Sequence, residues 1–284
     1  MTEHWQIEGP KVLDIGGEGE AVHSLKVGLV AGRVDIVTHD DSPTARLEVH
    51  SVDGKPLLVT WDGSTLKVSH VKDKEGNLWE NLKRFSKEHD RLNARVSLSV
   101  PTRTDVTVST VSADALVSGV RAGVKVNTVS GSLTLADVIG EVDANTVSGE
   151  LECHELEGDF KGNSVSGPLT VQASRLEQVK LNTVSGDITL DLLSGTARIN
   201  SNSVSGDVTV RIPAGGGYAV NAHTASGQVV IDGTSMTGSA GKRGGQLSEG
   251  DQALVVKANS ISGNVVVLRA QGIQDTVPPQ QNAG

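Results

Sequence analysis

NTVSGDITL, at residues 182–190, is one of seven related copies of a nine-residue motif between Asn127 and Val267. The others are NTVSGSLTL (127–135), NTVSGELEC (145–153), NSVSGPLTV (163–171), NSVSGDVTV (202–210), HTASGQVVI (223–231) and NSISGNVVV (259–267). Successive motif glycines are 18, 18, 19, 20, 21 and 36 residues apart. Such a nearly fixed period is typical of repeat proteins in which each unit packs against the next.

Apolar and polar residues alternate within each unit, which is the pattern of a half-buried β-strand. A unit of 18–21 residues is too short for a propeller blade and has no helix pattern, so we expect an all-β solenoid with one unit per turn. Stacked turns would place equivalent residues about 4.8 Å apart. The pattern predicts two buried ladders, one of Val129, Val147, Val165, Val184 and Val204, the other of Leu133, Leu151, Leu169, Ile188 and Val208.

Two further ladders are expected to be structural. Asparagine tolerates left-handed backbone, and its amide can bond to the turns above and below, so we expect a corner ladder. Its members are Asn127, Asn145, Asn163, Asn182, Asn202 and Asn259. Glycine after each motif serine would relieve crowding at a bend. These glycines are Gly131, Gly149, Gly167, Gly186, Gly206, Gly227 and Gly263.

The hydroxyl residues of the motif are predicted to point outward, as a flat grid. Such a surface could order water or bind a polymer, or it could be an ordinary solvated β face. The pairs are Thr128 with Ser130, Thr146 with Ser148, Ser164 with Ser166, Thr183 with Ser185, and Ser203 with Ser205.

Composition limits the function classes. The 284 residues carry a formal charge of −9, and only 2% of them are aromatic. With no basic stripe visible in the sequence, we expect no nucleic-acid partner. The single cysteine, Cys153, and the scattered histidines offer no metal-ligand spacing, so no metal or cofactor is expected. No apolar run fits a signal peptide or a membrane span, and the sequence predicts a cytoplasmic protein.

The chain divides into three predicted parts. Residues 1–100 form a β-rich N-terminal segment continuous with the solenoid, in which Trp5 and Trp61 could close the open end. Within it, residues 77–93 have helical spacing, which predicts a helix packed on the solenoid or an amphipathic element for a membrane surface or partner groove. Residues 101–268 form the solenoid, with a Gly- and Ser-rich projecting loop at 233–252, and residues 269–284 form a disordered tail.

One pair of carboxylates raises the question of catalysis. Asp187 and Asp207 follow motif glycines in neighbouring units and would lie about 5 Å apart, within the range for a retaining glycosidase. The alternative is two solvated carboxylates at the edge of a turn. Because the chain offers few aromatic platforms for a sugar, we expect no enzyme activity, and the pair remains a speculative surface site.

The TVSG-x-hydrophobic-T-hydrophobic copies, of which NTVSGDITL and NSVSGDVTV are the most specific, resemble a bacterial family. It is the β-strand-repeat "putative adhesin" family, whose domain is also called toastrack, and the resemblance covers roughly residues 10–268. It implies a single-stranded right-handed β-helix and an association with envelope-stress and membrane-associated regulatory systems. The family has no established catalytic residues to carry over.

Together these observations predict a non-catalytic β-solenoid that acts as a scaffold or interaction module. Its partner would be another protein or a second copy of the chain, bound through a ladder face, a terminal turn or the 233–252 loop. The alternative is a β-helix protein that binds or cleaves polysaccharide through its stacked carboxylates.

Overall fold

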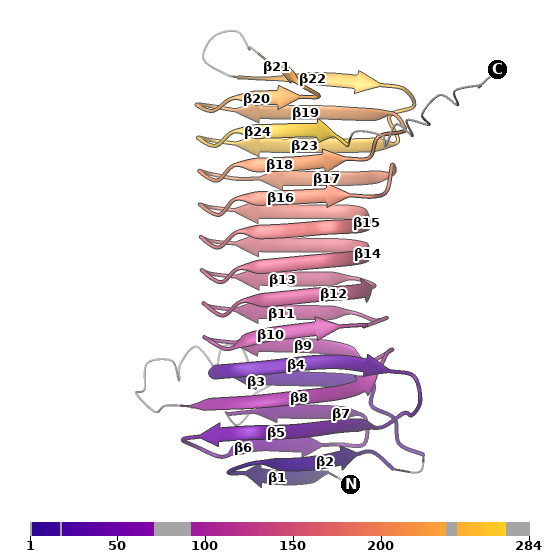
Figure 1. Cartoon of the computed structure of the whole chain (residues 1–284), viewed down its shortest axis with the longest axis vertical. Helices are drawn as coiled ribbons and strands as arrows, with labels where there is room; N and C mark the ends of the chain where they lie inside the picture. Colours follow the sequence, from indigo (N-terminus) through magenta and orange to yellow (C-terminus); the bar gives the residue numbers. More distant parts are fainter. Residues whose placement is uncertain (1, 18, 71–91, 237–242, 271–284) are drawn as a thin grey trace, which may run out of the picture.

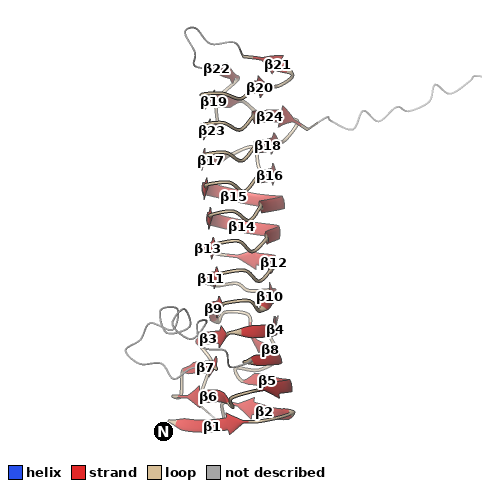
Figure 2. Cartoon of the chain, turned by 90° about the vertical axis from the view of Figure 1, so that its left-hand side faces the viewer, coloured by secondary structure: helices blue, strands red, loops and turns tan. Residues whose placement is uncertain are grey.

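The computed structural model describes residues 2–17, 19–70, 92–236 and 243–270. These residues form β-strands and no helix, which confirms the all-β prediction. Two sheets face each other along the whole length of an elongated rod (Figure 1). The view along the sheet edges shows how thin the stack is (Figure 2). We name the sheets by their most regular outward residues, the asparagine sheet and the threonine sheet.

The asparagine sheet lies at the back in Figure 1. Its strands in order along the rod are β1 (Glu3–Ile7), β6 (Leu57–Trp61), β7 (Thr65–Ser69), β3 (Ser24–Leu29), β9 (Asp105–Thr110), β11 (Val124–Thr128), β13 (Val142–Thr146), the second halves of β14 (Leu151–Ser164) and β15 (Leu169–Thr183), β17 (Ala197–Asn202), β23 (Leu254–Ser260), β19 (Tyr218–Thr224) and β22 (Arg243–Glu249).

The threonine sheet lies at the front of the same view. Its strands in order are β2 (Lys11–Ile15), β5 (Ala45–Asp53), β8 (Asn93–Pro101), β4 (Ala31–His39), β10 (Asp114–Ser118), β12 (Leu133–Ile139), the first halves of β14 and β15, β16 (Ile188–Leu192), β18 (Val208–Ile212), β24 (Val265–Arg269), β20 (Val229–Ile231) and β21 (Thr234–Ser235).

Parallel pairing fills the middle of the rod, and antiparallel pairing closes both ends. β1 and β2 pair antiparallel with β6 and β5, and β22 and β21 pair antiparallel with β19 and β20. At the N-terminal end Trp61 is buried, and its indole N–H donates to Glu20 at 2.9 Å. Trp5 is partly buried against the core. Parallel strands of a solenoid leave unpaired edges, so antiparallel caps of this kind protect them.

The leucine ladder forms one buried column between the sheets. Leu133 pairs with Leu151, and Leu151 pairs with Leu169. Ile188 and Val208 continue the column, and all five side chains are at most 1% exposed. Burying each such side chain contributes roughly 1.5–3 kcal/mol before chain entropy is counted. One layer alone buries too little to fold, so stability depends on stacking.

The predicted valine ladder is not buried, and this prediction was wrong. Val147, Val165, Val184 and Val204 are 38–46% exposed. The preceding residues are buried instead: Thr146, Ser164, Thr183 and Ser203 are 5–6% exposed. Alternation fails here because the motif is a turn between the sheets and not a continuous strand. The inward hydroxyl closes that turn, as in Thr183 Oγ1, which accepts the Gly186 N–H at 2.9 Å.

The last two motif copies are stacked in the reverse of their sequence order. β17 pairs with β23, and β23 pairs on its other side with β19. Likewise, β18 and β20 both pair with β24. The copy at 259–267 is therefore inserted between the copies at 202–210 and 223–231. The expectation that consecutive copies always lie in neighbouring layers holds only up to β18.

Three other predicted segments need comment. Most of the predicted 77–93 helix lies outside the described residues, and its last residue, Asn93, opens strand β8. The segment predicted to be a projecting loop at 233–252 contains β21 and β22, with residues 237–242 outside the described part. Of the predicted tail, Arg269 ends β24, and residues 271–284 are likewise not described.

The motif glycines fit where two layers approach most closely. A Cβ on Gly186 would lie 2.0 Å from the carbonyl oxygen of Gly167. The same contact recurs at Gly206, whose Cβ would lie 2.0 Å from the Gly186 carbonyl oxygen. Because both contacts are with backbone atoms, no side-chain movement can relieve them, and alanine would push the layers apart.

We expect Gly186→Ala to lower the free energy of unfolding by about 1–3 kcal/mol or more, through overpacking between layers. Gly215→Ala is the matched control, since a Cβ there meets nothing within 4 Å. Urea denaturation should separate the two variants. Equal stability for both would show that the layers can relax around a methyl group.

A second prediction concerns His70. Its ring is 4% exposed, Nδ1 accepts the Val30 N–H at 3.2 Å, and Nε2 has no hydrogen-bond partner among the described residues. Burial lowers the pKa of His70 from 6.5 to about 4. Between these values the unfolded chain binds the proton and the folded chain does not. The stabilising contribution is therefore full above pH 6.5 and is lost as the pH falls toward 4.

From pH 7 to pH 5 we expect His70 to lose about 2 kcal/mol of its contribution to the unfolding free energy. His70→Asn keeps a neutral polar side chain that does not titrate. The difference in unfolding free energy between pH 7 and pH 5, measured for both proteins, checks this. A His70→Asn variant with the same pH dependence as the native chain would rule out His70 as the source.

Candidate functional site

The most regular exposed apolar feature of the rod follows the motif turns along one edge. We call it the aliphatic edge and define it as Val147, Val165, Val184, Val204 and Ile261, which are 38%, 46%, 45%, 42% and 57% exposed. They occupy successive layers, because the N–H of each following motif serine donates to the carbonyl of the previous member, as from Ser166 to Val147 at 2.8 Å and from Ser262 to Val204 at 2.9 Å. At about 4.8 Å per layer the edge is about 19 Å long.

The serine hydroxyls beside the aliphatic edge point back to the backbone. Ser166 Oγ donates to the Val147 carbonyl at 3.2 Å, and Ser205 Oγ donates to the Val184 carbonyl at 3.2 Å. Ser262 does the same toward Val204 at 3.4 Å. The hydroxyl protons of Ser166, Ser205 and Ser262 are therefore used within the rod. The methyl groups are the distinctive outward chemistry of this edge.

The six asparagines form a hydrogen-bonded column on the asparagine sheet. Each Nδ2 donates to the Oδ1 of the layer before it. The steps are Asn145 to Asn127 at 3.2 Å, Asn163 to Asn145 at 2.8 Å, Asn182 to Asn163 at 3.0 Å, Asn202 to Asn182 at 3.1 Å and Asn259 to Asn202 at 3.1 Å. The last step joins residues 57 apart in sequence, so the column follows the stacking order and not the chain. His223 lies beside Asn259, in the layer between β23 and β22.

Asp187 and Asp207 lie in neighbouring layers, but their oxygens hold backbone groups. Asp187 Oδ1 accepts the Asp207 N–H at 2.9 Å, and Asp207 Oδ1 accepts the Asn264 N–H at 2.7 Å. Asp207 Oδ2 also accepts from the Asn264 amide at 3.2 Å. Each carboxylate thus satisfies the N–H that opens the next strand, which is a structural use of the pair.

The predicted flat grid of outward hydroxyl groups is not present in the structure. Its first members are buried and close the turns, so only the serines reach the surface. A column made mostly of threonines does occur on the threonine sheet, through Thr134, Glu152, Thr170, Thr189 and Thr209. The repeated L-T-L and V-T-V triplets contain this signal, because the middle residue of a strand triplet with buried neighbours must point outward.

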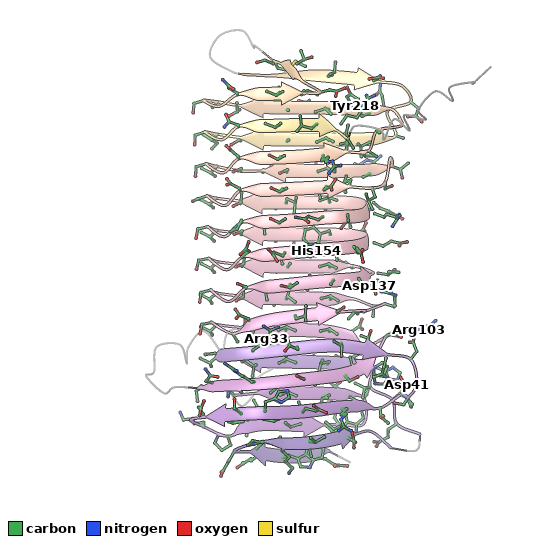
Figure 3. The ribbon with its side chains drawn as sticks, in the orientation of Figure 1. Arg33, Asp41, Arg103, Asp137, His154 and Tyr218 are labelled. Atoms are coloured by element: carbon green, nitrogen blue, oxygen red, sulfur yellow. The ribbon has the colours of Figure 1, made fainter. Side chains whose placement is uncertain are left out.

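A polar cluster near the C-terminal end of the rod was not predicted from the sequence. Arg269 lies over the ring of Tyr218, with the guanidinium carbon 4.9 Å from the ring centre. Figure 3 labels Tyr218 near this end of the rod. Arg269 also pairs with Glu249 at 2.6 Å and Asp232 at 3.6 Å. Burial, followed by the Asp232 charge, raises the pKa of Tyr218. The cluster joins β24, β19 and β22, and so fixes the inserted layer.

The described residues give little support for a metal site or a reactive cysteine. Within the described ranges, no group of three or more His, Cys, Asp or Glu side chains could hold a metal ion. Cys153 is fully buried, and burial raises the pKa of its thiol, so the reactive thiolate is disfavoured. No helix in the described part of the chain is long and apolar enough to cross a membrane.

Several solved structures are distantly similar to this chain, and two of them are described here. One is a "putative cell adhesion protein" from Clostridium sporogenes, with 12% identity, a TM-score of 0.26, and coverage of 92% of this chain and 100% of the other. The other is a "putative lipid binding protein" from Parabacteroides distasonis, with 13% identity, a TM-score of 0.42, and coverage of 93% and 97%. No curated protein matches the sequence significantly.

The family comparison is more informative. A model described as Toastrack DUF4097 matches residues 55–268, which takes in part of the N-terminal sheets and every motif copy. This match confirms the resemblance drawn from the TVSG copies. Because it covers most of the chain, the protein belongs to the Toastrack DUF4097 family.

Proposed function

We propose that the protein is a non-catalytic scaffold that associates with a second copy of itself through the aliphatic edge. The observation that carries this proposal is the line of exposed aliphatic side chains, one in each of five successive layers. A stripe of this kind gains free energy when another apolar surface covers it.

A second copy is the occupant that fits the spacing best. Two antiparallel edges with the same repeat of about 4.8 Å can interdigitate, so that each valine of one rod fits between two of the other. Such a two-fold contact is self-complementary. The edge is narrow and buries less than the roughly 800 Å² per partner of a stable interface, so weak, concentration-dependent association is expected.

The handedness and the number of residues per turn of the solenoid are also part of this proposal. We infer a single-stranded, right-handed coil of 18–21 residues per turn, because parallel strands joined by crossovers in one sheet are almost always right-handed. The family resemblance implies a link to envelope-stress or membrane-associated regulation. We propose that the scaffold acts in such a regulatory system. Polysaccharide cleavage is less well supported, because the backbone N–H groups engage Asp187 and Asp207.

We expect the triple substitution V165T/V184T/V204T to abolish self-association while leaving the fold intact. Threonine keeps the β-branched shape that the turn accommodates, and exposed substitutions usually change stability by less than about 0.5 kcal/mol. Sedimentation velocity from micromolar to millimolar concentration should show the native chain shifting toward a dimer and the triple variant remaining monomeric.

The control is V12T/V37T/L193T, which removes three exposed aliphatic side chains away from the edge, at 50%, 46% and 48% exposure. It should associate as the native chain does. A native chain that stays monomeric throughout, or an edge variant that dimerises normally, would defeat the proposal.

A further inference from the structure

A file of lysines runs along the outer face of the asparagine sheet, although the chain as a whole is acidic. We call it the lysine file and define it as Lys67, Lys26, Lys125, Lys161, Lys180 and Lys257. Strand register places them in one line: Lys67 beside Lys26, Lys26 beside Thr107, Thr107 beside Lys125, Lys125 beside Asp143, Asp143 beside Lys161, Lys161 beside Lys180, Lys180 beside Asn200, and Asn200 beside Lys257.

The file spans eight layer spacings, or about 38 Å at 4.8 Å each. Its one carboxylate, Asp143, lies between Lys125 at 3.8 Å and Lys161 at 3.6 Å. In the described part of the chain, no carboxylate lies within ion-pair distance of Lys26, Lys180 or Lys257. The premise that the chain lacks a basic stripe is therefore not upheld. These lysines are 19 to 77 residues apart in the sequence and look scattered there, but the solenoid places them in one line.

A second column of donors runs parallel to the file. Four of the lysines stand two residues before a ladder asparagine, in KVN, KGN, KLN and KAN at residues 125–127, 161–163, 180–182 and 257–259. Residues two apart on a strand point to the same face. Each asparagine amide has two N–H groups, and the ladder uses one of them at Asn163, Asn182 and Asn259. These three layers therefore present an ammonium group and an amide N–H side by side.

Carboxylates bound the opposite side of the file. Asp105, Glu141 and Asp159 each stand two residues before a member of the line, at Thr107, Asp143 and Lys161, whereas Arg198 stands two residues before Asn200 and is the one cation among the described residues on that side. The three carboxylates would repel an anion from that side. The attractive lane for an anionic chain thus lies between the lysines and the asparagines, parallel to the rod axis.

We propose that this lane binds an extended chain of phosphate groups. Lysine binds phosphate as a point charge, and amide N–H groups donate to phosphate oxygens. The file and the asparagine column contain no aromatic side chain in their described residues, so they offer no platform on which nucleotide bases could stack. The required ligand is a linear polymer of phosphates without aromatic bases, such as inorganic polyphosphate.

The test measures binding of fluorescently labelled inorganic polyphosphate to the full chain by anisotropy, at several salt concentrations. We expect K161Q/K180Q/K257Q to weaken binding at least tenfold at low salt. The slope of log affinity against log salt should fall by about 2, by the relation for single-stranded polyanions. The control K11Q/R95Q/R103Q removes the same number of positive charges from exposed positions outside the file and should bind within twofold of the native chain.

Three other anionic ligands test whether the lane is specific for polyphosphate. A single-stranded oligonucleotide, a polyuronate and vesicles of anionic lipid should each bind more weakly than polyphosphate. Tighter binding of any of them, or equal losses in the file variant and the control, would overturn the proposal. Circular dichroism would establish that the variants fold. The variant V165T/V184T/V204T should bind polyphosphate normally, so failure of the self-association proposal would leave this one standing.

Discussion

The contact between motif glycines in neighbouring layers is the constraint on which the rest of this structure depends. Each glycine turns the chain from one sheet to the other directly against the carbonyl oxygen of the layer before it. The contacts run from Gly149 on Gly131 to Gly263 on Gly206 and Gly227 on Gly263, and a Cβ added to each glycine would lie only 1.9–2.2 Å from the carbonyl oxygen. Backbones can approach so closely only without side chains. The turns therefore stack in register, and every other residue of the motif falls into a column.

Sequence reasoning predicted most of the fold, and its failure at the turn has a clear physical cause. Period-two alternation placed Leu133 and its equivalents in the core correctly, because they lie within a true strand. Extending the same alternation through Val184 ignored the hydroxyl of Thr183, which closes the turn on the Gly186 N–H and must point inward. A Thr-x-x-Gly turn competes with strand alternation, and the side-chain hydrogen bond decides the outcome.

The reversed stacking order of the last two motif copies could not be predicted from the repeat period. It nevertheless places the copy that is more similar to the others inside the stack. The copy inserted as an inner layer carries Asn259 and Ile261, which continue the asparagine column and the aliphatic edge. The copy placed outside it has His223 and Ala225 at these positions, so both columns change character there. A divergent repeat at the end of the stack is the usual arrangement of a capping repeat. The spacing of 36 residues between motif glycines hinted at an interruption, but nothing local showed where the chain would return.

The candidate surfaces were missed for a related reason, since their residues are separated by a full turn in sequence. No window of the sequence is basic around Lys161 or apolar around Val165. One lysine or one valine per layer is enough to form a continuous surface, because stacking places equivalent residues in a line about 4.8 Å apart. A ligand that repeats along its own length can engage many weak contacts at once, and the contacts after the first are intramolecular. Such a rod can therefore bind without a pocket. For the proposed contacts, specificity would reside in the spacing of the layers, which the glycine contacts set.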